Sequence, residues 1–448
     1  MDYRACKEAI IRYAAEKGLE EYEIYYQAEE STSVSAFMHE INQFTGSVEG
    51  GLCFRCIVNG RMGYASTEEL SEAQAKRVVD TAYENALALE ADEPVFLVAG
   101  GQTYEKIDRA PYALPTTEAL IQKVLDTQEA MYAANPAVID GSSTQGLSIH
   151  MEMDIFNSKG LDLHHEGKVS GLIVAAVVSD GKEMENDYQI KLAKLDEIDS
   201  TELTKKAAET AIKKLGGEVA PTGSCPVVFD PEAMSDLLST YSSIFSSEMA
   251  QKGLSKLAGK EGECIAAPIV TIVDDPFYAE NPMPMPFDAE GSPTRCKNLV
   301  EKGELKTLLY NLKTAAVAGK ETTGNASKSG YNSAVGIHPF TLYLAAGDFT
   351  VDELVAKADK GVFINSLGGL HAGADPVTGD FSLQSAGYLI EDGKLSTHVK
   401  SFTVAGNFYD MLKEIVALSD KVELPMATSS TAFGAPAALI KSLSIAGK

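Results

Sequence analysis

Cys53 and Cys56 have the C-x-x-C spacing that is found in zinc sites and in redox sites. A structural zinc site needs two further ligands, and the sequence has no second cysteine pair of this kind. A redox site needs the pair at the start of a helix, whereas these two cysteines lie in a strand-like run. Strand alternation also places residues 53 and 56 on opposite faces. The pair therefore predicts two separate structural cysteines.

Two histidines, His39 and His165, are each followed by a glutamate, as in the zinc-binding motif H-E-x-x-H. That motif needs a second histidine four residues after the first, but Gln43 and Val169 stand at those positions. His164 cannot serve instead, because neighbouring residues on a strand point to opposite faces. We interpret these histidines as exposed residues at strand ends.

A glycine-rich stretch at residues 368–381 also holds one histidine and two aspartates. Such glycine density is typical of a loop that approaches a ligand or another chain closely through its backbone. The alternative is a pair of tight turns with a solvated histidine. The candidate interface or peptide-binding residues of this loop are Gly368, Gly369, His371, Gly373, Asp375, Gly379 and Asp380.

Several common catalytic motifs are missing from the sequence. It has no dinucleotide-binding G-x-G-x-x-G and no G-x-S-x-G nucleophile elbow. The segment Gly253–Lys260 has the wrong glycine spacing for a phosphate-binding loop, and no Ser or Thr follows its lysine. The sequence therefore does not indicate a nucleotide-binding enzyme or an α/β-hydrolase.

The predicted helices and strands that must position these residues do not follow a regular βαβ alternation, which favours an α+β fold. A glycine- and proline-bearing stretch at 216–223 predicts two domains, 1–220 and 221–448, each mixing antiparallel sheet with helices. The predicted helices cover residues 3–17, 66–90, 117–134, 202–215, 231–250, 351–361 and 407–418. Capping boxes are predicted at Ser66 with Glu69 and at Thr350 with Glu353. The predicted strands include residues 22–28, 32–38, 52–58, 61–65, 226–229, 388–390 and 395–399. Asn59 and Gly60 predict a hairpin turn between the strands at 52–58 and 61–65.

The chain is strongly acidic, with 38 Lys and Arg against 64 Asp and Glu among 448 residues and a net charge of −26. Such a surface repels phosphate backbones and anionic lipid, so nucleic acid and membrane are not expected partners. No apolar run approaches the ~18–20 residues of a membrane span, and the N-terminus has no signal-peptide core. Six cysteines do not form a disulfide scaffold, which favours a reducing cytoplasm.

Several segments, taken together in their order, resemble the TldD/PmbA family, and more closely its PmbA (TldE) branch. Each segment is short, but the series spans most of the chain. The matching segments are 49–51, 63–67, 157–160, 272–276, 287–294, 323–326, 368–382 and 403–407.

This resemblance implies a TldD/PmbA-like fold and a role in proteolysis. Paired paralogues of the family form a cytosolic metallopeptidase that trims unfolded peptides, which are held largely through their backbone as an added strand. The TldD-type chain carries zinc on a helical H-E-x-x-x-H together with a cysteine from a late strand. The family was once described as a modulator of DNA gyrase, but the acidity of this chain speaks against direct contact with DNA.

The sequence departs from the zinc-bearing pattern at each ligand. The helix predicted in the corresponding place, residues 231–250, has no histidine, and the late strand at 381–388 has no cysteine. Asp236 and Glu248 lie too far apart on that helix to share a turn. The resemblance therefore implies a metal-free, non-catalytic subunit, with zinc only in a TldD-type partner. The expected partners are that paralogue or a second copy of this chain, together with unfolded peptide.

Two other functions stay open. One is an autonomous hydrolase with a non-zinc site around His371, Asp375 and Asp380. The other is a homo-oligomeric scaffold or binding protein without a role in proteolysis. The missing zinc ligands favour the metal-free subunit and the scaffold over the hydrolase, and the resemblance favours the subunit over the scaffold.

Overall fold

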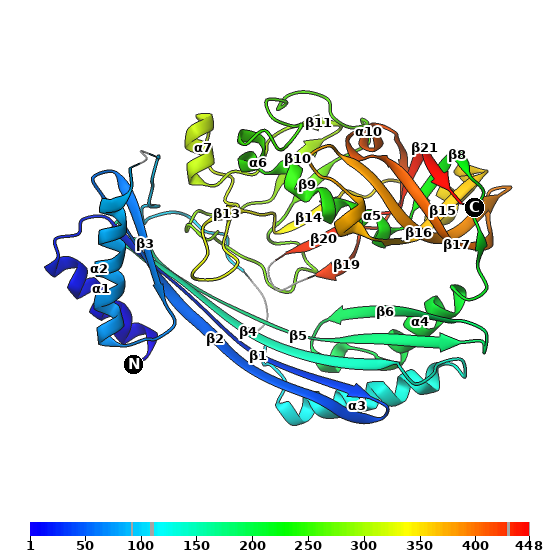
Figure 1. Ribbon diagram of the computed structural model, residues 1–448, viewed down its shortest axis with the longest axis horizontal. Coiled ribbons are helices and arrows are strands. Elements are labelled where there is room, and N and C mark those ends of the chain that lie inside the picture. The colour runs from blue at the N-terminus through cyan, green and yellow to red at the C-terminus, as the bar shows by residue number, and fades with distance from the viewer. Residues whose placement is uncertain (91–92, 108–111, 428–430, 448) are drawn as a thin grey trace.

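The computed structural model describes residues 1–90, 93–107, 112–427 and 431–447. A long, curved antiparallel sheet from the N-terminal half lies along a more compact C-terminal half (Figure 1). The mixed α+β fold predicted from the sequence is confirmed. Among the described residues, no helix is long and apolar enough to cross a membrane.

The N-terminal sheet has six strands in the order β3-β2-β1-β4-β5-β6, and every neighbouring pair is antiparallel. Helices α1 and α2 pack at one end of this sheet, and α3 and α4 pack at the other (Figure 1). The strands are β1 (Tyr22–Phe37), β2 (Glu40–Val58), β3 (Arg61–Thr67), β4 (Ser143–Asn157), β5 (Asp162–Ser179) and β6 (Met184–Leu192). The helices are α1 (Tyr3–Glu16), α2 (Glu72–Ala88), α3 (Thr117–Ala134), the short η1 (Leu195–Glu197) and α4 (Ser200–Lys213).

Two predictions for the N-terminal half were wrong in detail. The strands predicted at 22–28 and 32–38 are one continuous strand, β1. The helix predicted to start with a Ser66 capping box begins instead at Glu72, where the Ser71 side chain accepts a hydrogen bond from the amide of Gln74. Ser66 pairs with Cys53 in the sheet, so its backbone is held in β3 and cannot start a helix.

The C-terminal half contains a seven-stranded sheet, a six-stranded sheet and a two-stranded hairpin. Their orders are β18-β21-β8-β15-β16-β17-β7, β11-β10-β9-β14-β20-β19 and β12-β13. The strands are β7 (Glu218–Val219), β8 (Gly223–Phe229), β9 (Ile272–Asp274), β10 (Lys297–Glu301), β11 (Glu304–Leu305), β12 (Ala326–Ser327), β13 (Gly336–Ile337), β14 (Thr341–Leu344), β15 (Gly361–Gly368), β16 (Asp380–Glu391), β17 (Lys394–Asn407), β18 (Ile415–Leu418), β19 (Glu423–Ala427), β20 (Ala432–Ala435) and β21 (Ala438–Ala446). The helices are α5 (Pro231–Tyr241), η2 (Ser242–Phe245), α6 (Ser247–Gln251), α7 (Leu312–Ala318), α8 (Val351–Ala358), α9 (Leu370–Gly373) and α10 (Phe408–Lys413).

Three helices of the C-terminal half are shorter than predicted. The helix predicted at 231–250 is broken after Tyr241 into α5, a 3-10 turn and α6. The helix predicted at 407–418 ends at Lys413, because residues 415–418 pair with β21 as strand β18. Helix α8 ends at Ala358, and the chain enters β15 at Gly361.

The two halves of the chain share a hydrophobic cluster. On the N-terminal sheet it includes Tyr25, Met153 and Ile155, and from the C-terminal half it includes Met283 and Phe287. The last N-terminal helix ends at Lys213 and β7 already pairs with β17, so the change from one sheet to the other occurs between residues 213 and 218. The C-terminal half is therefore packed directly on the curved sheet.

Candidate functional site

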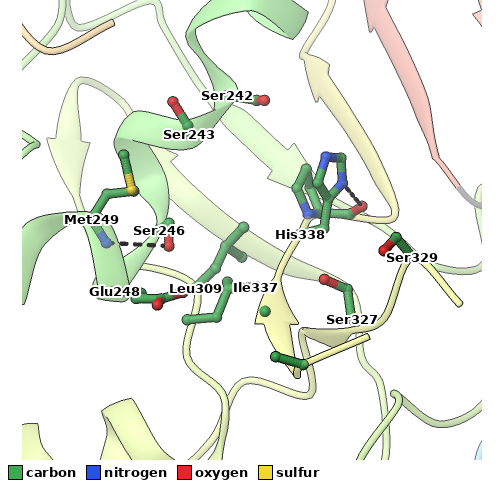
Figure 2. Close-up of a pocket in the computed structure, with 13 residues that line it drawn as sticks. Ser242, Ser243, Ser246, Glu248, Met249, Leu309, Ser327, Ser329, Ile337 and His338 are labelled. Atoms are coloured by element: carbon green, nitrogen blue, oxygen red, sulfur yellow. Dashed lines mark hydrogen bonds between the residues drawn. The ribbon is translucent and has the colours of Figure 1, made fainter. Parts of the chain in front are cut away.

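A cavity of about 350 Å³ lies beside the break between α5 and α6 (Figure 2). This is the segment that the family resemblance equates with the zinc-binding helix. Figure 2 shows Glu248 and Met249 on one side of the cavity and His338 and Ser329 on the other. The lining residues are Ser242, Ser243, Ser246, Glu248, Met249, Leu309, Ser327, Ser329, Ala334, Gly336, Ile337, His338 and Pro339.

One wall of the cavity is formed by the broken helix. The side chain of Ser246 accepts a hydrogen bond from the amide of Met249 at 3.5 Å and so caps α6. The amide of Leu309 donates to the carbonyl of Phe245 at 2.8 Å, and the amide of Ser247 donates to the carbonyl of Leu309 at 3.0 Å. These bonds fix the break in place, so the serines around it face the cavity from a defined backbone.

The other wall is formed by β12, β13 and His338. The His338 amide donates to the carbonyl of Asn325 at 3.1 Å, and the Asn325 side chain donates to the carboxylate of Asp274 at 2.7 Å. Asp274 is fully buried and forms an ion pair with Lys297 at 2.9 Å. His338 Nδ1 lies 3.1 Å from the carbonyl of Pro339. A buried polar network therefore holds the histidine at the rim of the cavity.

The polar groups around the cavity do not fit a zinc ion. They comprise one histidine, one carboxylate and five serine hydroxyls, and the carboxylate of Glu248 is already 2.6 Å from the ammonium of Lys252. Zinc in proteins takes histidine, cysteine or carboxylate ligands, usually three or four that converge on one point. Throughout the described part of the chain, no group of three or more His, Cys, Asp and Glu side chains is arranged to hold a metal. These hydroxyls can instead exchange hydrogen bonds with a peptide backbone.

The glycine-rich loop predicted as an interface or peptide-binding site lies elsewhere. Gly368 ends β15, Gly369 precedes the single turn α9 with a φ of 77°, and His371 is exposed on that turn. None of the seven candidates (Gly368, Gly369, His371, Gly373, Asp375, Gly379 and Asp380) is among the residues that line the cavity beside the broken helix.

The two aspartates of this loop are brought together through their backbones, because the amide of Asp375 donates to the carbonyl of Asp380 at 2.9 Å. Their side chains form hydrogen bonds with different partners. The Asp375 carboxylate accepts from the amide of Val377 at 2.9 Å, which lowers its pKa, and the Asp380 carboxylate accepts from the side chain of Asn407 at 2.7 Å. A Cβ on Gly379 would lie 2.4 Å from the ring of Tyr409. The aspartates and Gly379 therefore stabilise compact turns.

The predicted separation of the cysteines is confirmed. Both are buried, but Cys53 packs in the cluster between the two halves, whereas Cys56 packs in the cluster beneath α1 and α2. The histidines of β5 also separate. His164 is exposed and lies 3.2 Å from the carboxylate of Asp154. The interpretation of His165 as exposed was wrong, because its ring packs edge-on against Phe287.

Burial lowers the pKa of His165 to about 4 from 6.5. The unfolded chain therefore binds a proton at this residue between pH 6.5 and 4 that the folded chain does not bind, and the stability from neutral His165 is lost as the pH falls through this window. Over this window the unchanged chain should lose up to about 3 kcal/mol in its free energy of unfolding because of His165. We expect the His165→Gln variant to lack this loss. Urea unfolding at several pH values measures this, and His164→Gln on the opposite face is the matched control. An unchanged pH slope in His165→Gln would contradict this placement.

Three carboxyl groups at the start of α5 have raised pKa values. Burial raises the pKa of Asp230 and Glu232 to about 7 and the pKa of Asp236 to about 6. The Asp230 side chain caps the helix by accepting from the amide of Ala233 at 2.8 Å. Asp236 and Glu248, which the sequence placed on one helix, belong to two different helices.

Sequence reasoning missed His338 and the serines of the cavity. One signal was available, because residues 239–247 hold five serines and a threonine within a predicted helix. Serine and threonine side chains compete for backbone hydrogen bonds and favour caps and turns over helix interiors. No comparable signal marked His338, which reaches the cavity through tertiary contacts.

Comparison with known proteins places the chain in a family. Three sequence profiles match, described as PmbA/TldA metallopeptidase domain 1 (residues 22–86), central domain (residues 111–215) and C-terminal domain (residues 222–447). Strands β1 to β3 come from the first matched segment and β4 to β6 from the second, so two family segments build one sheet.

Similar proteins carry names from both branches of the family. A metalloprotease PmbA homolog of Haemophilus influenzae is 25% identical over 401 residues, covering 87% of this chain and 85% of that protein. A metalloprotease TldD homolog of the same organism is 30% identical over 224 residues, covering 50% of this chain and 46% of that protein.

Among solved structures, a Thermotoga maritima protein described as a modulator of a DNA gyrase superimposes with a TM-score of 0.90. It is 28% identical, and the match covers 99% of this chain and 100% of that one. Profiles, relatives and fold agree over almost the whole length, and the chain belongs to the PmbA/TldD metallopeptidase family.

Proposed function

We propose that this chain is the metal-free, PmbA-type subunit of a cytoplasmic PmbA/TldD metallopeptidase that trims unfolded peptides. The observation that carries the proposal is the sequence of the broken helix. Residues 231–251 contain no histidine and no cysteine, and the last cysteine of the chain is Cys296, before the late strands. The cavity beside the break offers one histidine and one carboxylate, which is too few ligands for zinc.

In this proposal the zinc and the hydrolytic step belong to a TldD-type paralogue. The cavity of this chain is lined by hydroxyls and by a histidine held through its backbone, and it suits contacts with the main chain of an extended peptide. Main-chain contacts of this kind tolerate many peptide sequences. The glycine-rich loop at 368–381 remains the proposed surface for subunit or peptide contact. The carboxylates of its two aspartates accept hydrogen bonds from different partners within turns, so they do not form a joint site.

The proposal predicts an all-or-none dependence of peptidase activity on the paralogue. The purified chain alone is expected to cleave no unfolded peptide, whereas its mixture with a TldD-type paralogue is expected to cleave and to lose activity in a chelator. Product formation from an unfolded polypeptide, followed by mass spectrometry, measures this.

The matched control is the same mixture with a paralogue lacking its zinc-binding histidines, which should be inactive. Chelator-sensitive cleavage by this chain alone would contradict the proposal. Cleavage by this chain that survives a chelator and is lost in His371→Ala would support the alternative hydrolase.

A further inference from the structure

The hairpin of β12 and β13 (residues 326–337) has one side on the cavity and the other on the N-terminal sheet. Ser327 and Ser329 line the cavity (Figure 2). Lys328, which stands between them, instead places its ammonium 4.5 Å from the centre of the Tyr25 ring on β1. Successive side chains of an extended segment point to opposite sides. The backbone that forms one wall of the cavity therefore also rests on the sheet.

The loop and the return strand of the hairpin repeat this arrangement. Ala334 and Gly336 line the cavity, whereas Val335 packs on the hydrophobic cluster shared by the two halves. The ring of Tyr331 packs on the same cluster, and Figure 1 shows this loop, beside β13, extending toward the N-terminal sheet near β3. A Cβ on Gly51 of β2 would lie 2.6 Å from two atoms of the Tyr331 ring. The missing side chain at Gly51 thus provides the space that this ring occupies.

The base of the hairpin is fixed within the C-terminal half. The amide of Ala326 donates to the carboxylate of Asp288 at 3.0 Å, and the amide of Ala289 donates to the carbonyl of Ala326 at 3.0 Å. Asp288 is itself buried, so these bonds belong to the core of that half. Movement of the hairpin is therefore a movement of its loop, which the contacts with the N-terminal sheet restrain.

A native thiol lies where the hairpin contacts the sheet. Cys53 on β2 is the cross-strand neighbour of Tyr25 and is 3% exposed. Burial raises the pKa of the Cys53 thiol, and the ammonium of Lys328 is the first of the charges that oppose this rise. Because Tyr331 packs on the same cluster as Cys53, lifting the loop would expose this thiol to reagents in solution.

We propose that Lys328 and Tyr331 are positioning residues, which hold the β12–β13 hairpin on the N-terminal sheet and so fix the serine-bearing wall of the cavity for contact with peptide. The inference rests on the peptide contact proposed above for this cavity. Neither residue is among those that line the cavity, so each acts through the hairpin that it holds. The hydroxyls need a fixed backbone because hydrogen bonds weaken steeply with distance and angle. The N-terminal sheet thereby supports a site that none of its residues lines.

The first test removes the aromatic anchor and follows the native thiol. Tyr331→Ala is expected to raise the rate at which N-ethylmaleimide labels Cys53 by about tenfold or more, because local opening becomes more frequent. Tyr331→Phe keeps the ring and is the matched control, with an unchanged rate. Mass spectrometry of the digested protein measures each cysteine separately. Cys56, in the cluster beneath α1 and α2, reports unfolding of the sheet and should keep its rate, and the exposed Cys264 and Cys296 report the reagent.

The second test reverses the charge of the other anchor. Lys328→Glu would place a carboxylate over the negative face of the Tyr25 ring and near the buried Glu23, so the labelling rate of Cys53 should rise about tenfold or more. Lys328→Arg keeps a cation over the ring and should restore the unchanged rate. Lys182→Glu, at an exposed turn, changes the net charge equally and should have no effect.

The third test connects the hairpin to peptide. The probe is a fluorescent synthetic unfolded peptide of Ala, Ser, Thr and Leu, and anisotropy measures its Kd. If peptide binds only while the hairpin is in place, peptide at about ten times its Kd should slow the labelling of Cys53 about tenfold. The double variant of Tyr331→Ala and Lys328→Glu should bind the peptide about tenfold more weakly or worse, because the competent form is less populated.

The outcomes separate this inference from the function proposed above. Unchanged labelling of Cys53 in both Tyr331→Ala and Lys328→Glu would overturn the anchoring. Equal acceleration at Cys53 and Cys56 in both variants would also overturn it, because the sheet itself would then be opening. Faster labelling of Cys53 alone, with no protection by peptide and no change in peptide Kd in the double variant, would support the anchoring. That result would overturn the peptide contact of the cavity and the positioning role with it.

Discussion

Arg55→Met is expected to lower the free energy of unfolding by about 3–5 kcal/mol, the loss typical when one member of a buried ion pair is removed. Arg55 stands between Cys53 and Cys56 on β2, and it is the direct cross-strand neighbour of Glu23 on β1. The guanidinium Nη2 lies 2.6 Å from Glu23 Oε1, and the side chains are only 6% and 1% exposed. The variant would leave the Glu23 carboxylate buried without its cation.

The surroundings of the pair explain why the loss is large. Burial raises the pKa of Glu23, and Arg55 acts against this rise. Burial also raises the pKa of Glu290, a residue of the C-terminal half, and Arg55 is again the first of the groups that oppose this rise, followed by the hydrogen bond from the Leu312 amide. One guanidinium thus acts electrostatically on carboxyl groups from both halves of the chain at their contact. Its removal is expected to weaken both the sheet and the packing of the C-terminal half on it.

Urea unfolding at neutral pH measures this effect. The matched control is Arg12→Met, which breaks the exposed ion pair between Arg12 and Glu72 and should cost at most about 1 kcal/mol. Replacing Glu23 and Arg55 together by apolar residues should recover part of the loss, because no unpaired charge then remains at Glu23. Equal losses in Arg55→Met and Arg12→Met would contradict this account of the contact.

Gly63→Ala is expected to destabilise the chain by about 3 kcal/mol or more, because the added methyl group has no space. A Cβ at this position would lie 1.9 Å from the carbonyl oxygen of Ala82 and 2.5 Å from the amide nitrogen of Ala86. Both are backbone atoms of α2, which packs directly on β3. Rotation of a side chain cannot relieve the contact, so the helix would have to move away from the sheet.

Gly46→Ala provides the opposite expectation in the same sheet. No atom lies within 4 Å of a Cβ at Gly46, and alanine restricts the unfolded chain more than glycine does, so this variant should be neutral or slightly stabilising. Thermal unfolding of the two variants and the unchanged chain measures the difference. A Gly63→Ala variant as stable as Gly46→Ala would show that α2 does not lie against β3 as described.

The sequence was most informative where local chemistry decides the structure. Asn59 and Gly60 predicted a hairpin, and both have the positive φ that such a turn needs. The capping box of Thr350 and Glu353 starts α8 as predicted, with both reciprocal hydrogen bonds present. In these cases the residues that form the feature are neighbours in the chain, so their spacing contains the necessary information.

Prediction failed where contacts distant in sequence decide the structure. Ser66 and Glu69 have the spacing of a helix cap, but pairing with β2 holds Ser66 in a strand. His165 was expected to be exposed, but Phe287, more than a hundred residues away in the chain, covers it. The cavity joins the serines at 242–246 to Ser327 and His338, which only the tertiary fold brings together. The absence of histidine and cysteine from residues 231–251 can be read from the sequence, whereas the cavity itself could not be predicted from it.

The zinc content of the purified chain tests the central claim most directly. The chain would be expressed alone in zinc-containing medium, dialysed against buffer without chelator and analysed by inductively coupled plasma mass spectrometry, with a TldD-type paralogue treated in parallel. Zinc far below one ion per chain in this protein, with stoichiometric zinc in the paralogue, is the result that the metal-free role predicts. One tightly bound zinc ion per chain in this protein would contradict it.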